Sequence, residues 1–199
     1  MQDPESMREL YAELSDTEIA WMAMSQGSQL GPEAVAVLHA EIRKRGLSSE
    51  LGLALTTQAD PISPGELQDL ADRFRRQPCG RCGSWERPLN AFEIARVWSV
   101  ILVTSYKKEL LIACPDCILA SAKRAQAFTV LVGWWGIPWG PIRTIQAIAI
   151  NSRTIRHGDE DHPSEALTAF VRDHRGEITV ALRDAEAESR SSDRERPAF

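Results

Sequence analysis

Four cysteines stand in two closely spaced pairs near the middle of the chain. Cys79 and Cys82 form one CxxC unit, Cys114 and Cys117 form the other, and 31 residues separate the pairs. Zinc is commonly held by four thiolates arranged as a tetrahedron, and CxxC is the spacing at which two sulfurs of one tight turn reach the same ion. We therefore predict a structural zinc site with these four ligands, whose metal contributes folding free energy.

Other roles for the paired cysteines have less support from their surroundings. A redox-active CxxC stands beside a βαβ pattern, which is absent here, and a catalytic zinc keeps an open coordination position that four thiolates would fill. Two disulfides and four unligated thiols remain as alternatives. The chain contains no phosphate-binding glycine loop, no GxSxG and no HExxH motif. We therefore expect a protein that is not an enzyme and binds no small-molecule substrate.

The segment between the cysteine pairs predicts a β-hairpin. Residues 94–103 and 109–113 are rich in β-branched and apolar residues, and the polar residues 104–108 between them favour a turn. A hairpin clamped at its base by two CxxC turns is the arrangement of a zinc ribbon. The gap between the pairs is longer than in short ribbons, so residues 85–92 must form an extra loop or a third strand.

A long uncharged segment follows the second cysteine pair. Residues 125–142 are 18 residues without a charge, between Lys123-Arg124 and Arg143. Glycines and prolines in its centre argue against a straight membrane-spanning helix, because they would leave backbone groups unpaired in lipid. We predict instead an apolar helical hairpin, with helices over 118–132 and 141–151 and a tight turn over 134–140.

The turn of this apolar hairpin is rich in tryptophan. Three of the six tryptophans in the chain lie within six positions of one another. Indole rings favour the headgroup level of a membrane, and flanking Lys or Arg favours anionic lipid. The alternative is that the hairpin packs across the ribbon and completes its core. The candidate residues for membrane or partner contact are Trp134, Trp135, Ile137, Pro138 and Trp139.

Charge is divided unevenly along the 199 residues. The net charge is −5 overall, but it is −6 over residues 1–60, +6 over 61–157 and −5 over 158–199. We expect the basic middle segment to contact an anionic partner or the acidic ends of its own chain. Zinc with four thiolates would lower its charge by about two. The candidate anion contacts are Lys107 and Lys108, expected at the tip of the β-hairpin, and Lys123 and Arg124.

A helical hairpin is predicted at the N-terminus. Ser15 and Glu18 form a capping box for a helix over 16–26, and Pro32 begins a second helix that ends before Gly46. Such a hairpin is usually a packing or docking element.

Less regular segments are expected elsewhere. Residues 48–63 mix Ser, Thr, Gly, Ala and Pro and indicate a linker, followed by a short helix over 64–76. Apolar positions predict a helix over 163–184, with Gly176 as a candidate break. Residues 185–199 have little to bury and are expected to be disordered.

Together these patterns predict an α+β protein: a small four-cysteine zinc ribbon with flanking short helices and a hydrophobic Trp/Gly/Pro helical hairpin. The expected segments are an acidic helical hairpin (1–47), a linker with a short helix (48–77), the zinc ribbon (78–120), the hydrophobic hairpin (121–155), a C-terminal helix (156–184) and a disordered tail (185–199). The acidic loop 157–162 is a weaker candidate for a second metal site, since such loops are usually solvated.

The order of these motifs resembles a group of bacterial proteins without an assigned activity. The shared features are CxxCG at 79–83, a β-hairpin, CPxC at 114–117 and LVGWWGIPWGPIRTIQAIAIN at 131–151, preceded by helices like 14–24 and 32–47. The resemblance covers about residues 10–155, and its most specific parts are the cysteine pairs and residues 133–141. It implies a zinc ribbon joined to a GWWG-PWG hydrophobic segment, and membrane-associated or peripheral binding more than enzymatic activity.

We therefore expect a non-enzymatic zinc-ribbon scaffold or adaptor that contacts a membrane surface or a protein partner through its Trp-rich hairpin. The alternative is a zinc ribbon that binds nucleic acid through Tyr106, Lys107 and Lys108, although a pI of about 5.5 is low for that class. No secretory signal is recognised in residues 1–15, so we expect a cytoplasmic protein, peripheral or monotopic at the inner membrane.

Overall fold

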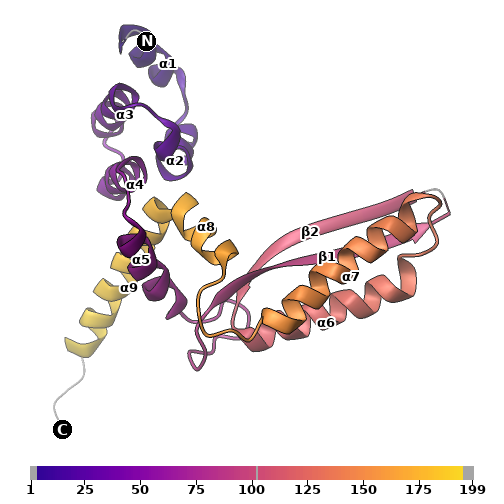
Figure 1. Ribbon diagram of the computed structural model, residues 1–199. Coiled ribbons are helices and arrows are strands. Elements are labelled where there is room, and N and C mark those ends of the chain that lie inside the picture. Colours follow the sequence, from indigo (N-terminus) through magenta and orange to yellow (C-terminus); the bar gives the residue numbers. More distant parts are fainter. Residues whose placement is uncertain (1–3, 102, 195–199) are drawn as a thin grey trace. The chain divides into compact units, whose positions relative to one another are not determined.

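The computed structural model describes residues 4–101 and 103–194 and has an α+β fold made mostly of helices (Figure 1). Its helices are α1 (Pro4–Glu13), α2 (Asp16–Ser25), the 3-10 helix η1 (Gly27–Gln29), α3 (Pro32–Lys44), α4 (Ser49–Ala59), α5 (Pro64–Arg75), α6 (Pro115–Val132), α7 (Trp139–His157), α8 (Glu165–Asp173) and α9 (Arg175–Arg194). Strands β1 (Asn90–Val100) and β2 (Val103–Ala113) form an antiparallel sheet. The chain divides into two compact units, residues 1–70 with 170–199 and residues 71–169.

Helices α1 to α4 and α9 pack together in the first unit. The predicted capping box is present: the Ser15 N–H donates to the Glu18 carboxylate at 2.8 Å, and the Ser15 hydroxyl accepts from the Glu18 N–H. The chain leaves α3 through Gly46, whose φ of +65° suits glycine. Ile19 and Leu38 are completely buried. The two predicted N-terminal helices are therefore confirmed, and α1 packs against α3 as an additional one.

The linker predicted over 48–63 is wrong, because α4 lies there. The Ser48 hydroxyl accepts a hydrogen bond from the N–H two residues later and begins the helix. Leu55 is completely buried in the core, and the buried Gln58 amide donates to the carbonyl of Asp173 at 3.0 Å. Small and polar residues are helical here because packing supplies the stabilisation that their modest helix propensity does not.

The C-terminal helix is divided at His174 into α8 and α9, close to the candidate break at Gly176. The disorder expected from residue 185 is wrong over 185–194, where α9 continues, and residues 195–199 lie outside the described part of the chain. Residues 185–194 include two Ala, two Glu and two Arg, which are strong helix formers and favour a helix over this segment.

In the second unit β1 and β2 form a long hairpin, whose register pairs Asn90 with Ala113 at the base and Val100 with Val103 at the turn. The turn predicted over 104–108 is wrong, because those residues lie within β2. The chain reverses after Val100 instead, and Ile101 has a φ of +48°. Two-residue hairpin turns require this left-handed conformation, which β-branched residues rarely adopt, whereas polar runs are common turn sequences.

The predicted apolar helical hairpin is present as α6 and α7, which pack against each other and against β1 (Figure 1). Both helices are longer than predicted, and the chain turns between Gly133 and Pro138. Small and polar side chains are buried on these helices, which allows close approach of the backbones. They include Ser121, Ala122, Ala125, Thr129, Thr144, Ala147, Asn151 and Thr154.

Side chains of α6 and α7 pair with the edge of β1 that faces away from β2. The Asn151 Oδ1 accepts from the Ala95 N–H at 3.0 Å, and its Nδ2 donates to the Ala95 carbonyl at 2.8 Å. The Thr129 hydroxyl accepts from the Val97 N–H at 3.2 Å. The Thr154 hydroxyl donates at 2.8 Å to the carbonyl two residues before Ala95, that of Glu93. The helices thus satisfy backbone groups that a further strand would otherwise satisfy.

Candidate metal centre and apolar end

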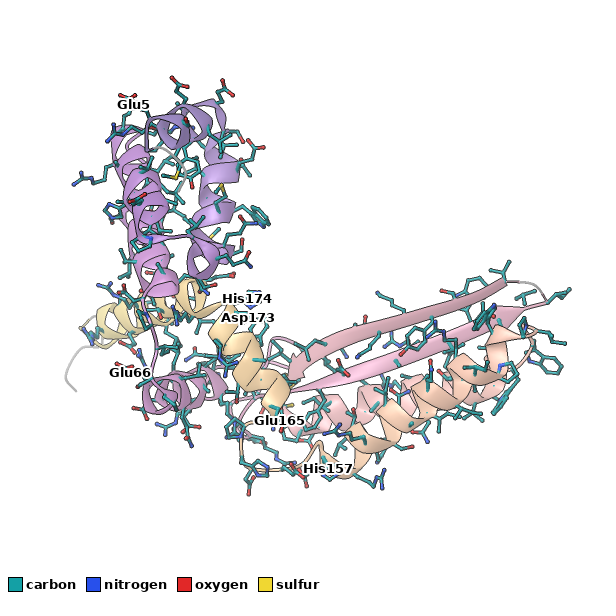
Figure 2. The ribbon with its side chains drawn as sticks, turned by 45° about the horizontal axis from the view of Figure 1, so that its top comes forward. Glu5, Glu66, His157, Glu165, Asp173 and His174 are labelled. Atoms are coloured by element: carbon teal, nitrogen blue, oxygen red, sulfur yellow. The ribbon has the colours of Figure 1, made fainter. Side chains whose placement is uncertain are left out.

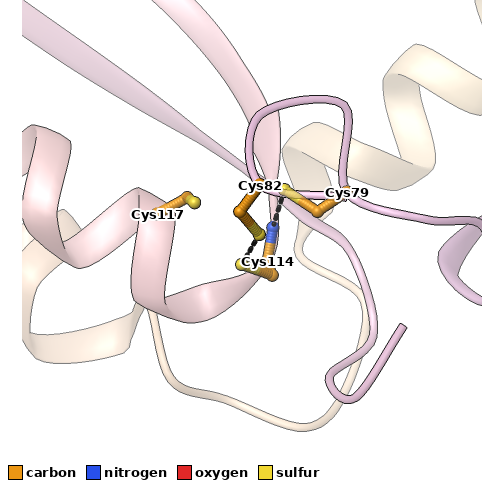
Figure 3. A group of neighbouring side chains, drawn as sticks. All are labelled: Cys79, Cys82, Cys114 and Cys117. Atoms are coloured by element: carbon orange, nitrogen blue, oxygen red, sulfur yellow. Dashed lines mark hydrogen bonds between the residues drawn. The ribbon is translucent and has the colours of Figure 1, made fainter. Parts of the chain in front are cut away.

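The four cysteines come together from two parts of the second unit. Cys79 and Cys82 lie in the loop that follows α5, whereas Cys114 is the N-cap of α6 and Cys117 lies in its first turn. The β-hairpin starts soon after the first pair and ends directly before the second, so it returns the chain to the same place. The four Sγ atoms lie within 4.8 Å of one another (Figure 3).

The spacing of these sulfurs fits a tetrahedral metal site. Four thiolates bound at about 2.3 Å from one zinc ion lie about 3.8 Å from each other. The Sγ atoms of Cys82 and Cys114 are 3.7 Å apart, and all four cysteines are free thiols. Within the part of the chain that the structure describes, no other group of three or more His, Cys, Asp or Glu side chains gathers in this way. The four cysteines can therefore hold a metal ion.

The surroundings of Cys79 favour its thiolate. Burial opposes ionisation, but the backbone N–H groups of Cys114, Arg81 and Cys82 donate to its sulfur, and the balance lowers the pKa of Cys79 to about 6. The bond from the Cys114 N–H is 3.4 Å long. Burial raises the pKa of Cys117 to about 12 and also raises the pKa of Cys114. These two thiols must therefore lose their protons when they bind a metal.

The second cysteine pair differs from the predicted ribbon. The first pair forms a tight turn, closed by the Gly83 N–H donating to the Cys79 carbonyl at 2.7 Å, with Gly83 at a φ of +71°. The second pair starts a helix, because Pro115 occupies a first-turn position at which proline favours helix initiation. The partial positive charge of this helix N-terminus favours thiolates. Residues 83–89 form a loop, and the described sheet has no third strand.

Basic side chains near the cysteines have protein partners. Arg81 donates to the Ser121 hydroxyl at 2.6 Å. Arg87 pairs with Asp116 at 3.3 Å and also with Asp159. These contacts connect the first cysteine loop to α6 and to the segment that follows α7.

The turns of the two hairpins meet at the end of the second unit remote from the cysteines (Figure 1). The Ser99 hydroxyl donates to the Gly133 carbonyl at 2.9 Å, which joins β1 to the end of α6. We call residues 90–157 the arm and this end of it the apolar end. His157 marks the opposite end of α7 (Figure 2). The exposed apolar side chains at the apolar end include Val100, Ile101, Val103, Phe128, Val130, Leu131, Trp134, Trp135, Ile137, Trp139, Ile142 and Ile145.

All five residues predicted from the sequence for membrane or partner contact are exposed at this end. The exposed fractions of Trp134, Trp135 and Trp139 are 41%, 69% and 60%. The indole N–H groups of the first two donate to carbonyls of α6, at 2.8 and 3.4 Å. Their polar atoms are therefore satisfied within the arm, while much of their apolar surface stays open. Among the described residues, no helix combines the length and apolar content needed to cross a membrane.

The contribution of the β-hairpin to this surface was missed from the sequence. Val100, Ile101 and Val103 belong to an apolar run that continues through the turn without a polar residue. Such a run is a signal of exposure at a hairpin turn, because a turn between two strands lies at the surface. The apolar run indicates an exposed apolar surface only when the position of the turn is already known.

The predicted anion contacts are placed in two groups. The prediction that Lys107 and Lys108 lie at the hairpin tip is wrong: both lie within β2, with Lys107 paired to Glu109 at 3.3 Å and Lys108 to Glu93 at 2.6 Å. Lys123 and Arg124 are exposed on α6 and have no ion pair with any described residue.

The histidines of the acidic loop also have a partner. His157 and His162 both contact the Glu160 carboxylate, at 2.6 and 3.1 Å. They belong to no group of potential metal ligands among the described residues.

Comparison of the chain with protein-family models, with characterised proteins and with solved structures found no significant match. A functional assignment therefore depends on two features of the second unit, the four clustered cysteines near the base of the β-hairpin and the exposed apolar surface at its turn.

Proposed function

We propose that the protein is a non-enzymatic scaffold whose arm, held at its base by a structural zinc ion, inserts its apolar end into a membrane interface. One observation carries this proposal: two separate turns converge so that their exposed apolar side chains form a single surface. Zinc is supported as the metal by the four-thiolate donor set and by the 3.7 Å sulfur spacing. Bound zinc would contribute folding free energy and no catalytic chemistry.

The exposed apolar side chains at the apolar end are unfavourable in water, which supports a role for this surface in binding another molecule or a membrane. Large contiguous apolar patches on a protein surface mark sites of interaction. Ile101 adds a backbone argument, because its left-handed conformation is unfavourable for a β-branched residue and its side chain is still 73% exposed. Packing within the fold does not explain why an isoleucine occupies this position. Contact of its side chain with the apolar part of a membrane would explain it.

The chemistry of the surface favours a membrane over a protein or nucleic acid. It combines indole rings with aliphatic side chains, as elements that sit at the headgroup boundary do. An amphipathic element that lies at the interface is buried by about 5–10 Å, a depth that the residues of the two turns span. The lysines considered for nucleic-acid contact are paired instead with carboxylates of the β-hairpin, Glu109 in β2 and Glu93 in β1.

A pair of matched tryptophan substitutions tests the proposal. Trp135 lies at the apolar end, and Trp85 lies in the loop over residues 83–89 that follows the first cysteine pair. Both side chains are 69% exposed, so replacing either one by serine removes no core side chain. We expect the wild-type chain and W85S to sediment with vesicles of phosphatidylcholine and phosphatidylglycerol, and W135S to bind about tenfold more weakly, because one buried apolar side chain is lost.

Three results would contradict this proposal. Wild-type protein that stays in the supernatant at every vesicle concentration would exclude insertion. Equal weakening by W85S and W135S would show that the apolar end has no special role in binding. A wild-type dimer that W135S converts to a monomer, without vesicle binding, would assign the apolar end to contact between two copies of the chain.

A further inference from the structure

The arm has a charge pattern that the apolar end alone does not explain. Neither residues 94–108 nor residues 117–158 contain an Asp or Glu. The same two segments contain eight basic residues: Arg96, Lys107, Lys108, Lys123, Arg124, Arg143, Arg153 and Arg156. Within residues 90–157 the only acidic residues are therefore Glu93, Glu109 and Asp116.

Element geometry places several of these cations at a common depth behind the turns. A helix rises about 1.5 Å per residue, so Lys123 and Arg124 lie about 14 and about 12 Å back from the end of α6, and Arg143 lies about 6 Å from the start of α7. A strand rises about 3.3 Å per residue, which puts Arg96 and Lys107 about 13 Å from the hairpin turn. Four elements thus each supply a cation within about 15 Å of the apolar end.

These cations differ in the carboxylates that face them. Arg96 and Lys107 share Glu109, at 3.5 and 3.3 Å, so one of the two positive charges is not neutralised. Arg143 lies with its guanidinium carbon 5.2 Å from the centre of the Tyr106 ring and forms no ion pair with a described residue. Lys123 and Arg124 are exposed on α6 and are likewise without an ion pair in the described chain.

We infer that the arm is selective for anionic lipid, with Lys123, Arg124 and Arg143 facing the negative headgroups when the apolar end is inserted. This inference rests on the membrane function proposed above. Insertion by about 5–10 Å brings residues 6 to 14 Å behind the turns to the headgroup level or within one Debye length of it, which is about 8–10 Å in physiological salt. A nucleic acid bound to the same cations would leave the adjacent apolar end in water, so lipid is the better match.

Two double variants that remove equal charge separate local contact from net charge. K123Q/R124Q removes the cations about 12 to 14 Å behind the apolar end, whereas R153Q/R156Q removes two exposed cations about 21 to 26 Å along α7, more than one Debye length from the headgroups when the apolar end is inserted by about 5–10 Å. The probe is sedimentation of the full chain with vesicles of phosphatidylcholine alone and with vesicles that also contain phosphatidylglycerol. Circular dichroism and metal content check that both variants are folded.

We expect the wild-type chain to bind the phosphatidylglycerol vesicles more tightly than the neutral ones, with an affinity that falls as salt is added. Each cation near an anionic leaflet contributes about a fivefold change in affinity, so K123Q/R124Q is expected to lose about 25-fold on anionic vesicles and little on neutral ones. R153Q/R156Q should stay within about twofold of the wild type.

The outcomes distinguish this inference from the function on which it rests. Equal wild-type binding to neutral and anionic vesicles, weakened about tenfold by W135S, would overturn the lipid selectivity and leave the membrane function intact. Equal losses in the two double variants would also overturn it, because net charge alone would then account for the preference. Absence of binding to either vesicle would overturn both.

Discussion

The backbone N–H of Ile137 donates to the carbonyl of Ile101 at 3.3 Å, so the turn between two helices is bonded to the turn between two strands. The neighbouring Gly136 packs closely at this junction: an added Cβ would lie 2.3 Å from the Thr104 Oγ1 and 3.0 Å from the Ser99 Cβ. The apolar end therefore exists as one surface only while the two hairpins are joined.

Replacing Gly136 by alanine is expected to destabilise this junction. The added Cβ has no room beside Ser99 and Thr104, and such overpacking typically costs about 1–3 kcal/mol. We expect lower unfolding free energy and faster amide hydrogen exchange in residues 99–104. The matched control is G80A, because a Cβ at Gly80 meets nothing within 4 Å. Unchanged exchange in G136A would show that the turns are not packed together in solution.

Replacing Ile101 by asparagine should have two effects of opposite sign. Asparagine adopts the left-handed conformation more readily than isoleucine, so I101N is expected to raise the unfolding free energy by about 1 kcal/mol. It also removes an exposed apolar side chain, so vesicle binding should weaken. Val103 is 59% exposed in β2 without a positive φ, and V103N should weaken binding without stabilising the fold. Stabilisation by both substitutions would contradict the backbone explanation.

Metal removal should loosen the base of the arm first. We expect about one zinc ion per chain in protein purified without chelator, because four thiolates fill one tetrahedral site. Chelation or C117S should increase hydrogen exchange in residues 79–83 and in the first turn of α6, and should expose the remaining thiols to a native-state thiol reagent. Acidification should release the metal, since the cysteines bind as thiolates. A metal-free preparation with all thiols unreactive would argue against the site.

The amide of Asn151 is expected to be a large single contribution to the stability of the arm. In N151A the N–H and the carbonyl of Ala95 lose their partner, and a buried unpaired polar group costs about 1–3 kcal/mol. The adjacent S152A removes a side chain for which no such bond exists among the described residues, and should change stability by less than about 0.5 kcal/mol. Urea denaturation of both variants gives the comparison. Equal stability would mean that water or a rearranged side chain pairs with Ala95.

The stability of the first unit should depend on pH through Glu41. Its carboxylate accepts from the Arg45 Nε at 2.7 Å and from the Lys44 Nζ at 3.2 Å, and the hydrogen bond from Arg45 is the main reason why the pKa of Glu41 lies below its usual 4.5. A lowered folded-state pKa means that the stabilisation is complete above about pH 4.5 and is lost as the pH falls further.

Hydrogen exchange of α1 to α3 at several pH values tests this dependence. E41Q should exchange faster than the wild type at neutral pH, and the difference should shrink below pH 4.5 as Glu41 is protonated. The exposed Glu33 on the same helix provides the control E33Q, for which no such difference is expected. A difference between E41Q and the wild type that is independent of pH would assign the effect to packing.

Features set by neighbouring residues could be predicted from the sequence. The Ser15 and Glu18 pair is a local signal, because each residue bonds to the backbone of the other three positions away. Cys79 and Cys82 are likewise close because of their spacing, and the same spacing predicts that each pair shares a site. The apolar helical hairpin follows from its long uncharged run interrupted by glycine and proline.

Features set by distant residues could not be predicted. The helix over 49–59 depends on burial of Leu55 and Gln58 against other segments of the first unit, which its composition does not reveal. The turn at Ile101 places a β-branched residue in the left-handed conformation, against its backbone preference. The polar residues 104–108 are therefore the stronger turn signal in the sequence. The second cysteine pair begins a helix that packs on the hairpin, and the CxxC spacing alone does not distinguish a tight turn from the start of a helix. The apolar end required both turns to be located before it could be recognised.

The bonds from α6 and α7 to β1 give the hairpin two unlike edges, and this determines how the protein can aggregate. Asn151 and Thr129 occupy backbone groups along β1, so a strand from another molecule finds no free ladder there. β2 has no strand partner on its outer edge within the described residues, and strand recruitment is therefore confined to that side. Charged residues 107–109 lie in the middle of β2 and oppose such pairing. Neutralising them would weaken this barrier to edge-to-edge association and expose β2 as a template for strand addition.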